Sequence, residues 1–209
     1  MRITPEAVSL AKKYIRREPM PRSLSQQMCA NRMEHLMHDV CFRTAELILE
    51  NDNALPERKK HLAQILPCIA FYETLVLETG SKAEALALYE KWCLIKVERM
   101  VKWISPLVKL PGLYKQVPKL MEKLLHTTFG EKAGFSHKNV SCANGFSVDI
   151  IRCPYVEMCR KYNCMEIARF FCQSDDLCYG NIHPKLHWGR SQTLGTGGLL
   201  CDFKLLIKE

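Results

Sequence analysis

The sequence predicts an α+β fold, in which an N-terminal helical region packs on a C-terminal α/β unit with a small antiparallel sheet. Two observations predict it. Apolar residues recur at helical spacing through roughly the first 125 residues, and β-prone stretches separated by turn residues follow Gly130. Helices grouped before strands are typical of α+β proteins. We place the helical region at residues 1–128 and the α+β unit at residues 129–209.

Two apolar stripes predict the first long helices. Residues 23–51 carry such a stripe from Cys29 to Ile48, so we expect one long helix there. A second stripe over residues 62–76 predicts another helix. Pro67 within it should kink that helix or divide it, because proline lacks the amide hydrogen that a helix interior needs.

Gly80, Ser81 and Glu84 mark the clearest helix boundary. Glycine suits the C′ position of the outgoing helix, and serine followed three residues later by glutamate forms a capping box for the next one. That next helix should bury a face made of Ala85, Tyr89, Cys93, Val97, Met100 and Ile104. Three prolines then interrupt the pattern, and a last helix is expected over residues 118–129.

The C-terminal unit is predicted from turn residues. Asn144-Gly145 lies between two β-prone stretches and is the strongest short hairpin signal. Residues 153–180 indicate one or two short helices. Residues 186–194 and 199–208 indicate two strands, joined by a turn that contains glycines 195, 197 and 198.

The composition is that of a soluble globular protein, with 47% hydrophobic and 25% charged residues. No apolar run approaches the roughly 18 residues that a membrane span needs, and the N-terminus carries charges where a secretory signal would be apolar. We therefore expect a cytoplasmic protein with no membrane partner. The net charge of +8 comes without the aromatic interleaving that stacks bases. We expect no nucleic-acid partner, and a positive field that helps to collect small anionic substrates.

The chain has eleven cysteines, an odd number, and no CxxC pair. We expect them to be reduced, with several acting as small core hydrophobes. The spacings within the set Cys153, Cys159, Cys164, Cys172 and Cys178 match no zinc-knuckle or ferredoxin pattern.

Cys153 precedes Pro154, which is favoured at the first position of a helix and so places Cys153 at the N-cap. The helix dipole and the unpaired amides there favour a thiolate, so the pKa of Cys153 should fall and its sulfur should become nucleophilic. The alternative is a cysteine that ends the preceding strand as a buried apolar group.

The last strand carries polar residues in an unusual order. Cys201 and Phe203 should point to one face and Asp202 to the other, because side chains alternate along a strand. Arg190, on the neighbouring strand, is the expected partner of Asp202. The pair would brace the two strands against each other.

Two segments, "CPYVEMCRKYNCMEIARFFCQSD" and "LHWGRSQTLGTGGLLCDFKL", resemble the characteristic pattern of the L-2-amino-thiazoline-4-carboxylic acid hydrolase family. The matching positions are Asp149, Cys153, Pro154, Cys172, Asp175, Arg190, Thr193, Leu194, Gly197, Gly198, Cys201, Asp202 and Phe203. "LPCIAFYETLVLETGSKAEALALYEKW" in the helical half is also similar, so the resemblance covers most of the chain. A more distant similarity is to the small-molecule-binding 4-vinyl reductase type of domain.

The resemblance implies hydrolytic opening of a cyclic isothiourea that carries a carboxylate, a step toward N-carbamoylcysteine. Arg190 or Arg152 would bind the substrate carboxylate. Asp175 is the first choice for the amidinium-like end. The remaining candidates for substrate binding are Asp149, Asp202 and Thr193. The candidates for catalysis are Cys153, Asp175 and Cys201.

Three mechanisms stay open at this point. A Cys153 thiolate could add to the ring carbon, a carboxylate could activate water, or a divalent metal held on Cys153, Cys172 and Cys201 could do so. A non-catalytic ligand or metal sensor, or a purely structural role, are the alternative functions. The partner expected is a small carboxylate substrate, and the large helical half could supply the surface of a homo-oligomer.

Overall fold

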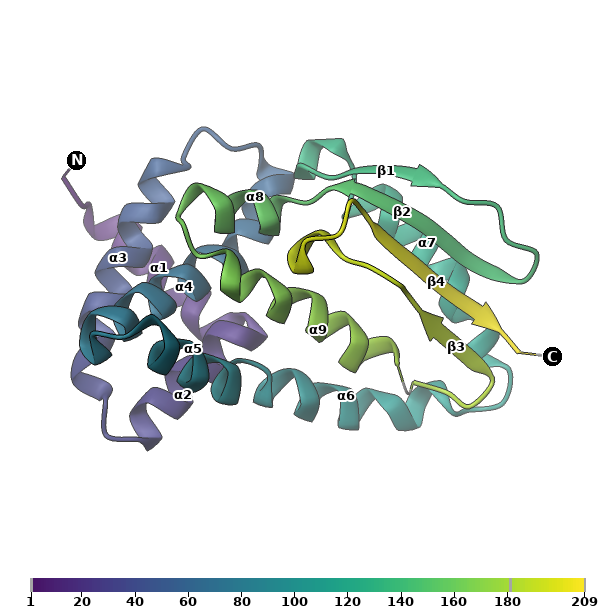
Figure 1. The fold of residues 1–209 in the computed structure, drawn as a ribbon, viewed down its shortest axis with the longest axis horizontal. Helices are drawn as coiled ribbons and strands as arrows, with labels where there is room; N and C mark the ends of the chain where they lie inside the picture. The colour runs from purple at the N-terminus through teal and green to yellow at the C-terminus, as the bar shows by residue number, and fades with distance from the viewer. Residues whose placement is uncertain (1, 181, 209) are drawn as a thin grey trace.

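The helical part and the sheet occupy opposite ends of the molecule, as Figure 1 shows. The structure is a computed structural model that describes residues 2–180 and 182–208, apart from the side chains of Ile104 and Leu107. Within these residues the helices dominate, and the strands form one small antiparallel sheet. The predicted α+β fold class is therefore confirmed.

The chain forms its longer helices in this order: α1 (Pro5–Arg17), α2 (Pro19–Ala30), α3 (Met37–Glu50), α4 (Pro56–Thr79), α5 (Lys82–Cys93), α6 (Ile95–Val108), α7 (Val117–Thr127), α8 (Pro154–Lys161) and α9 (Ala168–Tyr179). Short 3₁₀ turns lie between the helices and strands: η1 (Glu34–Leu36), η2 (Leu113–Gln116), η3 (Glu131–Ala133), η4 (Met165–Ile167) and η5 (Leu194–Thr196). The helix expected before Gly130 corresponds to α7, and the stretch after Cys153 forms two helices, as predicted.

The single long helix expected over residues 23–51 is wrong. α2 ends at Ala30, the chain turns at Arg32 with a φ of 61°, and α3 begins only at Met37. A positive φ cannot continue a right-handed helix. The apolar stripe therefore runs across a turn, and Cys29, expected on the inner face, is exposed.

The predicted boundary after α4 is confirmed. Gly80 adopts a left-handed φ of 64°, and its amide donates to the carbonyl of Val76 at 3.0 Å. The Ser81 hydroxyl accepts a hydrogen bond from the amide of Glu84 at 3.3 Å and so caps α5. Of the two effects expected of Pro67, a kink or a division of the helix, the division is wrong, because α4 continues through Pro67.

α4 is, among the described residues, the helix that is long and apolar enough to cross a membrane by length and composition. Its most apolar window is 67% buried inside the protein. A buried core helix passes the same test as a membrane span, and α4 packs against α1, α2, α3, α5 and α8. It serves here as the central helix of the core.

The buried face of the single helix that we expected from Ala85 to Ile104 extends only as far as Val97. The chain leaves the helical conformation at Leu94, which separates α5 from α6. The new direction leaves Met100 exposed, so its placement on the inner face was wrong. The side chain of Ile104 lies outside the described ones.

The sheet consists of β1 (Ser136–Asn139), β2 (Gly145–Arg152), β3 (Leu186–Gly189) and β4 (Cys201–Ile207), in the order β1-β2-β4-β3. Each neighbouring pair is antiparallel. Both predicted pairings, the hairpin at Asn144-Gly145 and the pair formed by the last two strands, are confirmed. In Figure 1, α7 runs behind the sheet, where it contacts β2.

Gly145 begins β2 rather than occupying a two-residue turn. Its φ is 150°, and a Cβ atom there would collide with the backbone carbonyl of Leu205 on β4. Glycine is therefore required for the close approach of the two central strands.

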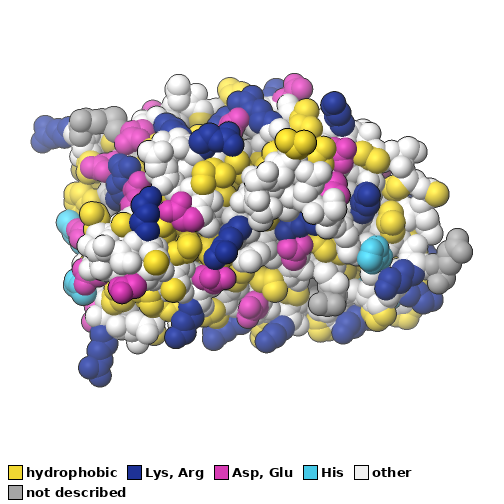
Figure 2. Space-filling view, viewed as in Figure 1, with side chains coloured by type: hydrophobic (Ala, Val, Ile, Leu, Met, Phe, Trp, Pro, Cys, Tyr) yellow, Lys and Arg dark blue, Asp and Glu magenta, His cyan; other side chains and the backbone are white. Residues whose placement is uncertain are grey.

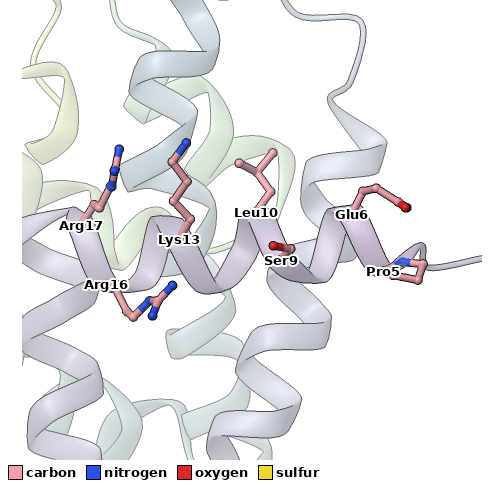
Figure 3. A pocket seen from close by; sticks show the side chains of 7 residues that line it. All are labelled: Pro5, Glu6, Ser9, Leu10, Lys13, Arg16 and Arg17. Atoms are coloured by element: carbon pink, nitrogen blue, oxygen red, sulfur yellow. The ribbon is translucent and has the colours of Figure 1, made fainter.

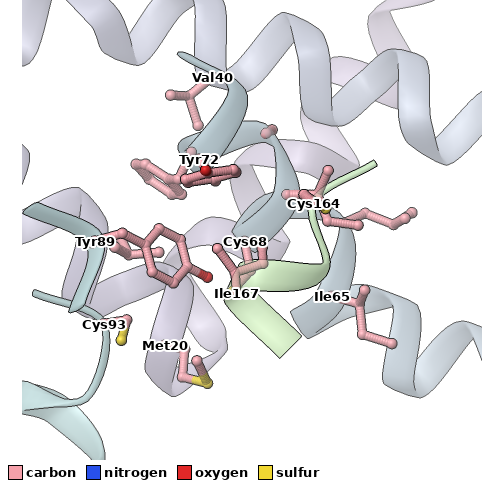
Figure 4. Close-up of a cluster of buried hydrophobic side chains, with 14 of the residues drawn as sticks. Met20, Val40, Ile65, Cys68, Tyr72, Tyr89, Cys93, Cys164 and Ile167 are labelled. Atoms are coloured by element: carbon pink, nitrogen blue, oxygen red, sulfur yellow. The ribbon is translucent and has the colours of Figure 1, made fainter. Parts of the chain in front are cut away.

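The largest hydrophobic core joins residues from both predicted regions. Figure 4 shows Tyr72 and Tyr89 from the helical region packed near Cys164 and Ile167, which follow α8. Phe170 of α9 is fully buried in the same cluster. The core therefore crosses the boundary that we placed at residue 128, and it holds α8 and α9 in position.

The positive charge is distributed over the surface. Figure 2 shows Lys and Arg side chains interspersed with acidic, apolar and neutral ones over most of this face, with a row of basic side chains along the lower edge. That edge corresponds to α6 in Figure 1.

We predict that replacing the buried Trp92, which is 1% exposed, with alanine lowers the free energy of unfolding by about 3–5 kcal/mol, because it leaves a cavity in the core. Trp103→Ala is the matched control, since Trp103 is 83% exposed. It should change the same free energy by no more than about 0.5 kcal/mol. Urea unfolding of both variants measures the difference, and equal effects would contradict the described packing.

Candidate active site

A cavity of about 220 Å³ lies between the inner face of the sheet and α9. Helices α4, α7 and α8 and the segment between α7 and β1 complete its walls. The residues that line it are Gln64, Met121, Leu125, Phe129, Phe135, Phe146, Val148, Ile150, Cys153, Tyr155, Val156, Phe171, Cys172, Ser174, Asp175, Tyr179, Trp188, Cys201 and Phe203. We call this cavity the sheet–α9 pocket. Four of the predicted site residues, Cys153, Cys172, Asp175 and Cys201, meet in it.

α9 contributes one helical face to the pocket. Phe171, Asp175 and Tyr179 are spaced four residues apart, and Cys172 lies three residues before Asp175. Residues at these spacings share one side of a helix. The neighbouring Phe170 points into the helical core instead, so a single helix joins the core to the pocket.

The two central strands contribute alternate residues. Val148 and Ile150 of β2 and Cys201 and Phe203 of β4 face the pocket. The prediction that Cys201 and Phe203 share one face, with Asp202 on the other, is confirmed.

Aromatic rings form most of the wall. Trp188 stacks on Phe203 with ring centroids 5.3 Å apart and lies against Tyr179 at 5.0 Å. Tyr155 packs on Phe171 at 4.9 Å. Such contacts fix the positions of the rings, and they give the pocket flat apolar surfaces suited to a small planar ring.

Asp175 is the one Asp, Glu, Lys or Arg among the described residues that line the pocket. Its side chain is 40% accessible. Burial among the rings raises the pKa of Asp175 to about 7, while Arg190 acts to lower it and Asp176 to raise it. A carboxyl group with this pKa can both accept and donate a proton near neutral pH.

Arg190 lies directly behind Asp175. Its side chain is only 9% exposed, and its Nη1 lies 3.8 Å from Asp175 Oδ2. Its Nη2 donates to the carbonyl of Cys172 at 2.8 Å and to the Asp176 carboxylate. Nη1 is buried and has no hydrogen-bond partner. Arg190 thus ties α9 to the end of β3 and keeps one donor unused beside the pocket.

Asp176 is a residue that sequence reasoning did not select. Its carboxylate accepts hydrogen bonds from Arg190 and, at 2.9 Å, from the indole nitrogen of Trp188. Asp176 therefore fixes the Trp188 ring and the Arg190 guanidinium relative to each other. Its position next to Asp175 was visible in the sequence, but its partners were not.

The prediction of a lowered pKa for Cys153 is wrong, although its predicted position at the N-cap of a helix is confirmed. Cys153 is the N-cap of α8 and Pro154 begins that helix. Burial nevertheless raises the pKa of Cys153 to about 12, and the amides at the start of α8 lower it by less. Cys201 behaves similarly, since burial raises its pKa to about 11 despite a 3.2 Å hydrogen bond from the Leu194 amide.

The third thiol of the pocket belongs to Cys172. Burial raises its pKa as well, although Thr193 and the backbone of Gly195 act to lower it. A Cβ atom on Gly195 would lie 2.8 Å from this sulfur. Glycine is therefore needed where η5 packs on α9.

The expected pairing of Asp202 with Arg190 is wrong. Asp202 accepts hydrogen bonds from the Ser191 amide at 2.9 and 3.0 Å, from the Ser191 hydroxyl at 2.8 Å and from the Gln192 amide at 2.9 Å. Burial alone would raise the pKa of Asp202, but these bonds outweigh it and hold the pKa below its usual value. Asp202 clamps the turn that carries Arg190, while the guanidinium turns toward α9.

Neither Arg190 nor Asp202 is among the residues that line the pocket, and the same holds for three other predicted substrate-binding residues. Asp149 lies opposite Asp202 on the outer face of the sheet. Thr193 is buried and caps η5, with its hydroxyl accepting from the Thr196 amide at 3.2 Å. Arg152 pairs with Glu157.

A buried histidine supports the pocket from behind. His61 Nε2 lies 2.9 Å from the carbonyl of Thr128, so this nitrogen must donate. Nδ1 then accepts from the hydroxyl of Tyr155 at 3.2 Å. Burial lowers the pKa of His61 and keeps the imidazole neutral. The sequence gave no indication of this pair, because its members are far apart along the chain.

Two further features were considered as sites. Within residues 2–180 and 182–208 no group of three or more His, Cys, Asp and Glu side chains could hold a metal ion, although all three cysteines proposed as ligands line the pocket. Figure 3 shows a depression along one side of α1, where the side chains of Lys13, Leu10 and Arg17 extend outward. It is open to solvent and brings no cluster of reactive groups together.

The fold and the pocket define an α+β protein whose enclosed aromatic site carries one carboxyl group of raised pKa and three thiols. The family model described as L-2-amino-thiazoline-4-carboxylic acid hydrolase matches residues 58–205, which is more than half of the chain and includes all the residues that line the pocket. The chain therefore belongs to the L-2-amino-thiazoline-4-carboxylic acid hydrolase family. No curated protein and no solved structure matches it.

We predict that Asp175→Asn changes the pH dependence of stability in a defined direction. Because the pKa of Asp175 is raised in the folded protein, the folded state binds the proton more tightly than the unfolded state, and the wild type loses stability as pH rises from about 4 to about 7. Asparagine does not titrate in this pH range, so the variant lacks this pH-dependent contribution to stability. The stability of Asp175→Asn relative to the wild type should therefore increase over this interval and level off above pH 7.

Urea unfolding at closely spaced pH values measures this difference. Asp149→Asn, on the outer face of the sheet, is the matched control and should run parallel to the wild type over the same interval. An Asp175→Asn curve parallel to the wild type would show that the carboxyl group titrates as it does in water.

Proposed function

We propose that this protein hydrolyses a small cyclic isothiourea of the 2-aminothiazoline-4-carboxylate type and opens the ring to N-carbamoylcysteine. Family membership supports the class of reaction. The observation that carries the proposal is the Asp175 carboxyl group, which has a pKa of about 7 in the wall of an aromatic pocket. The pocket offers room for a small heterocycle, and its rings offer flat surfaces on which such a ring can stack.

Asp175 acts in this proposal as a general base and then as a general acid. It takes a proton from a water molecule that adds to the ring carbon between sulfur and nitrogen. The C–O bond forms while the C=N electron pair moves to the ring nitrogen. The second proton of the water passes to that nitrogen as the carbonyl forms, the C–S bond breaks, and the proton held by Asp175 goes to the leaving sulfur. The product keeps both nitrogens and gains one water, so the reaction balances. A pKa near 7 suits both transfers at neutral pH.

The charges beside the pocket suit the two ends of such a substrate. The amidinium-like end is drawn to the ionised Asp175, and flat cations are also attracted to aromatic faces. The substrate carboxylate requires a cation. Arg190 is not among the residues that line the pocket, but its buried Nη1 has no hydrogen-bond partner and lies 3.8 Å from Asp175, and we assign this role to it. Arginine is well suited to this task because its donors match a carboxylate.

The raised thiol pKa values favour water over a thiolate as the nucleophile. At neutral pH the Cys153 thiol, with a pKa of about 12, is protonated almost completely. In this proposal Cys153 and Cys201 shape the pocket and stay close to the reacting carbon without adding to it. Bound metal is the remaining alternative, and elemental analysis of the purified protein and of Cys172→Ala tests it directly.

We predict that Asp175→Asn lowers kcat for 2-aminothiazoline-4-carboxylate by about 10²–10⁴-fold, the usual contribution of a general acid–base. Asp149→Asn should keep near wild-type activity.

The wild-type rate should rise as pH increases through about 7, since Asp175 must be ionised to accept a proton. A colorimetric thiol assay of the released N-carbamoylcysteine measures all three. No turnover in the wild type over a range of pH and added metals would refute the named activity.

We predict that Cys153→Ser retains activity within about tenfold of the wild type, because a buried neutral thiol and a hydroxyl differ little as wall groups. Steady-state kinetics of the variant, alongside its circular dichroism, provide the measurement. A loss of more than about 10³-fold in a folded Cys153→Ser protein would instead assign the attack to the thiolate.

A further inference from the structure

α6 has an outward face that is both apolar and basic. Val97 and Val108 are buried on its inner side, whereas Met100 and Trp103 are exposed on the other. Leu110 and Leu113, which follow the end of the helix, are also exposed. Trp103 is 83% exposed, a large cost for an indole ring if water is its permanent environment.

The same segment concentrates the positive charge of the chain. Residues 95–116 contain one acidic residue, Glu98, and five basic ones, Lys96, Arg99, Lys102, Lys109 and Lys115. Their net charge of +4 is half of the +8 of the whole chain. The basic row along the lower edge of Figure 2 lies over α6. We call Met100, Trp103, Leu110 and Leu113, with these five basic residues, the α6 surface.

We propose that the α6 surface binds peripherally to an anionic lipid bilayer. A helix with apolar and aromatic side chains on one face and Lys and Arg around them lies in the plane of the membrane interface. The indole ring reaches headgroup depth, and the long basic side chains extend to the lipid phosphates. Each basic side chain near such a surface adds to the binding.

Other occupants fit this surface less well. A second copy placed on it around a two-fold axis would bring the basic residues against one another, because the same patch faces itself in such an interface. A nucleic acid would complement the charge but would leave Leu110, which is 55% exposed, without an apolar partner.

Peripheral binding differs from crossing a membrane. The expectation of no membrane partner depended on the lack of an apolar run long enough to span a bilayer. α6 is 14 residues long, which is too short to span, and it needs only one apolar face to lie on the surface. The proposal is independent of the reaction in the sheet–α9 pocket, since none of the residues of the α6 surface lines that pocket.

Co-sedimentation with vesicles tests the proposal. The protein should bind vesicles of phosphatidylcholine with about 30% phosphatidylserine at least tenfold more tightly than pure phosphatidylcholine vesicles, and 1 M NaCl should weaken that binding. Trp103→Ser should reduce binding at least fivefold. Its control is Leu77→Ser, which removes another side chain that is 83% exposed but lies at the end of α4, and it should bind like the wild type.

Two double charge-reversal variants distinguish vesicle binding through the α6 surface from a general effect of net charge. Lys102→Glu with Lys109→Glu should reduce binding at least tenfold. Lys13→Glu with Arg16→Glu, on the side of α1 seen in Figure 3, changes the net charge equally and should reduce binding less than threefold. In the wild type, Trp emission should shift to the blue on adding anionic vesicles, and this shift should be lost in Trp103→Ser.

Three outcomes would overturn the proposal. The first is no binding to anionic vesicles by a folded wild-type protein. The second is an equal loss of binding in the α6 and α1 charge reversals. The third is a dimer, seen by sedimentation velocity, that Trp103→Ser dissociates, because this result would assign the α6 surface to a second copy.

Discussion

The burial of one carboxyl group beside one guanidinium is the constraint on which the candidate site depends. Asp175 lies in a wall of aromatic rings, where the loss of water disfavours its charge, and Arg190 opposes that effect from behind. Burial raises the pKa of Asp175 and Arg190 acts to lower it, so the value of about 7 depends on both surroundings.

Two faces of α9 together determine where this pair lies. One face of the helix packs into the core through Phe170, and the adjacent face presents Asp175 to the pocket. Because the core fixes α9, the position of the carboxyl group relative to the sheet is fixed as well, with 40% of the side chain accessible. The close approach of Gly195 and the clamp that Asp202 forms on the turn hold Arg190 against the same helix. Core stability and the acid–base property of the site are therefore linked.

Local features of the sequence were sufficient for much of the fold. Short-range chemistry determines three features that were predicted. They are the helix boundary at Gly80 and Ser81, the hairpin before Gly145, and the alternation of Cys201 and Phe203. The break at Arg32 was missed because apolar spacing does not reveal the sign of φ. The grouping of the pocket thiols with Asp175 followed from the family pattern, which periodicity alone does not supply.

The two errors at the site, at Cys153 and at Asp202, have different physical origins. The helix dipole at Cys153 was read correctly, but the larger effect of desolvation depends on residues from α7, α8 and α9 that meet only in the folded protein. The partner of Asp202 was missed because backbone amides of the next turn compete with a guanidinium for the same oxygens.

The most direct measurement is a carbon-13 NMR titration of the Asp175 side-chain carboxyl, assigned with the Asp175→Asn variant. The described burial predicts a midpoint near pH 7, and a higher midpoint when Arg190 is replaced by glutamine, since Arg190 lowers the pKa. A midpoint near 4, the value of an aspartate in water, would contradict both the enclosed pocket and the acid–base role assigned to this residue.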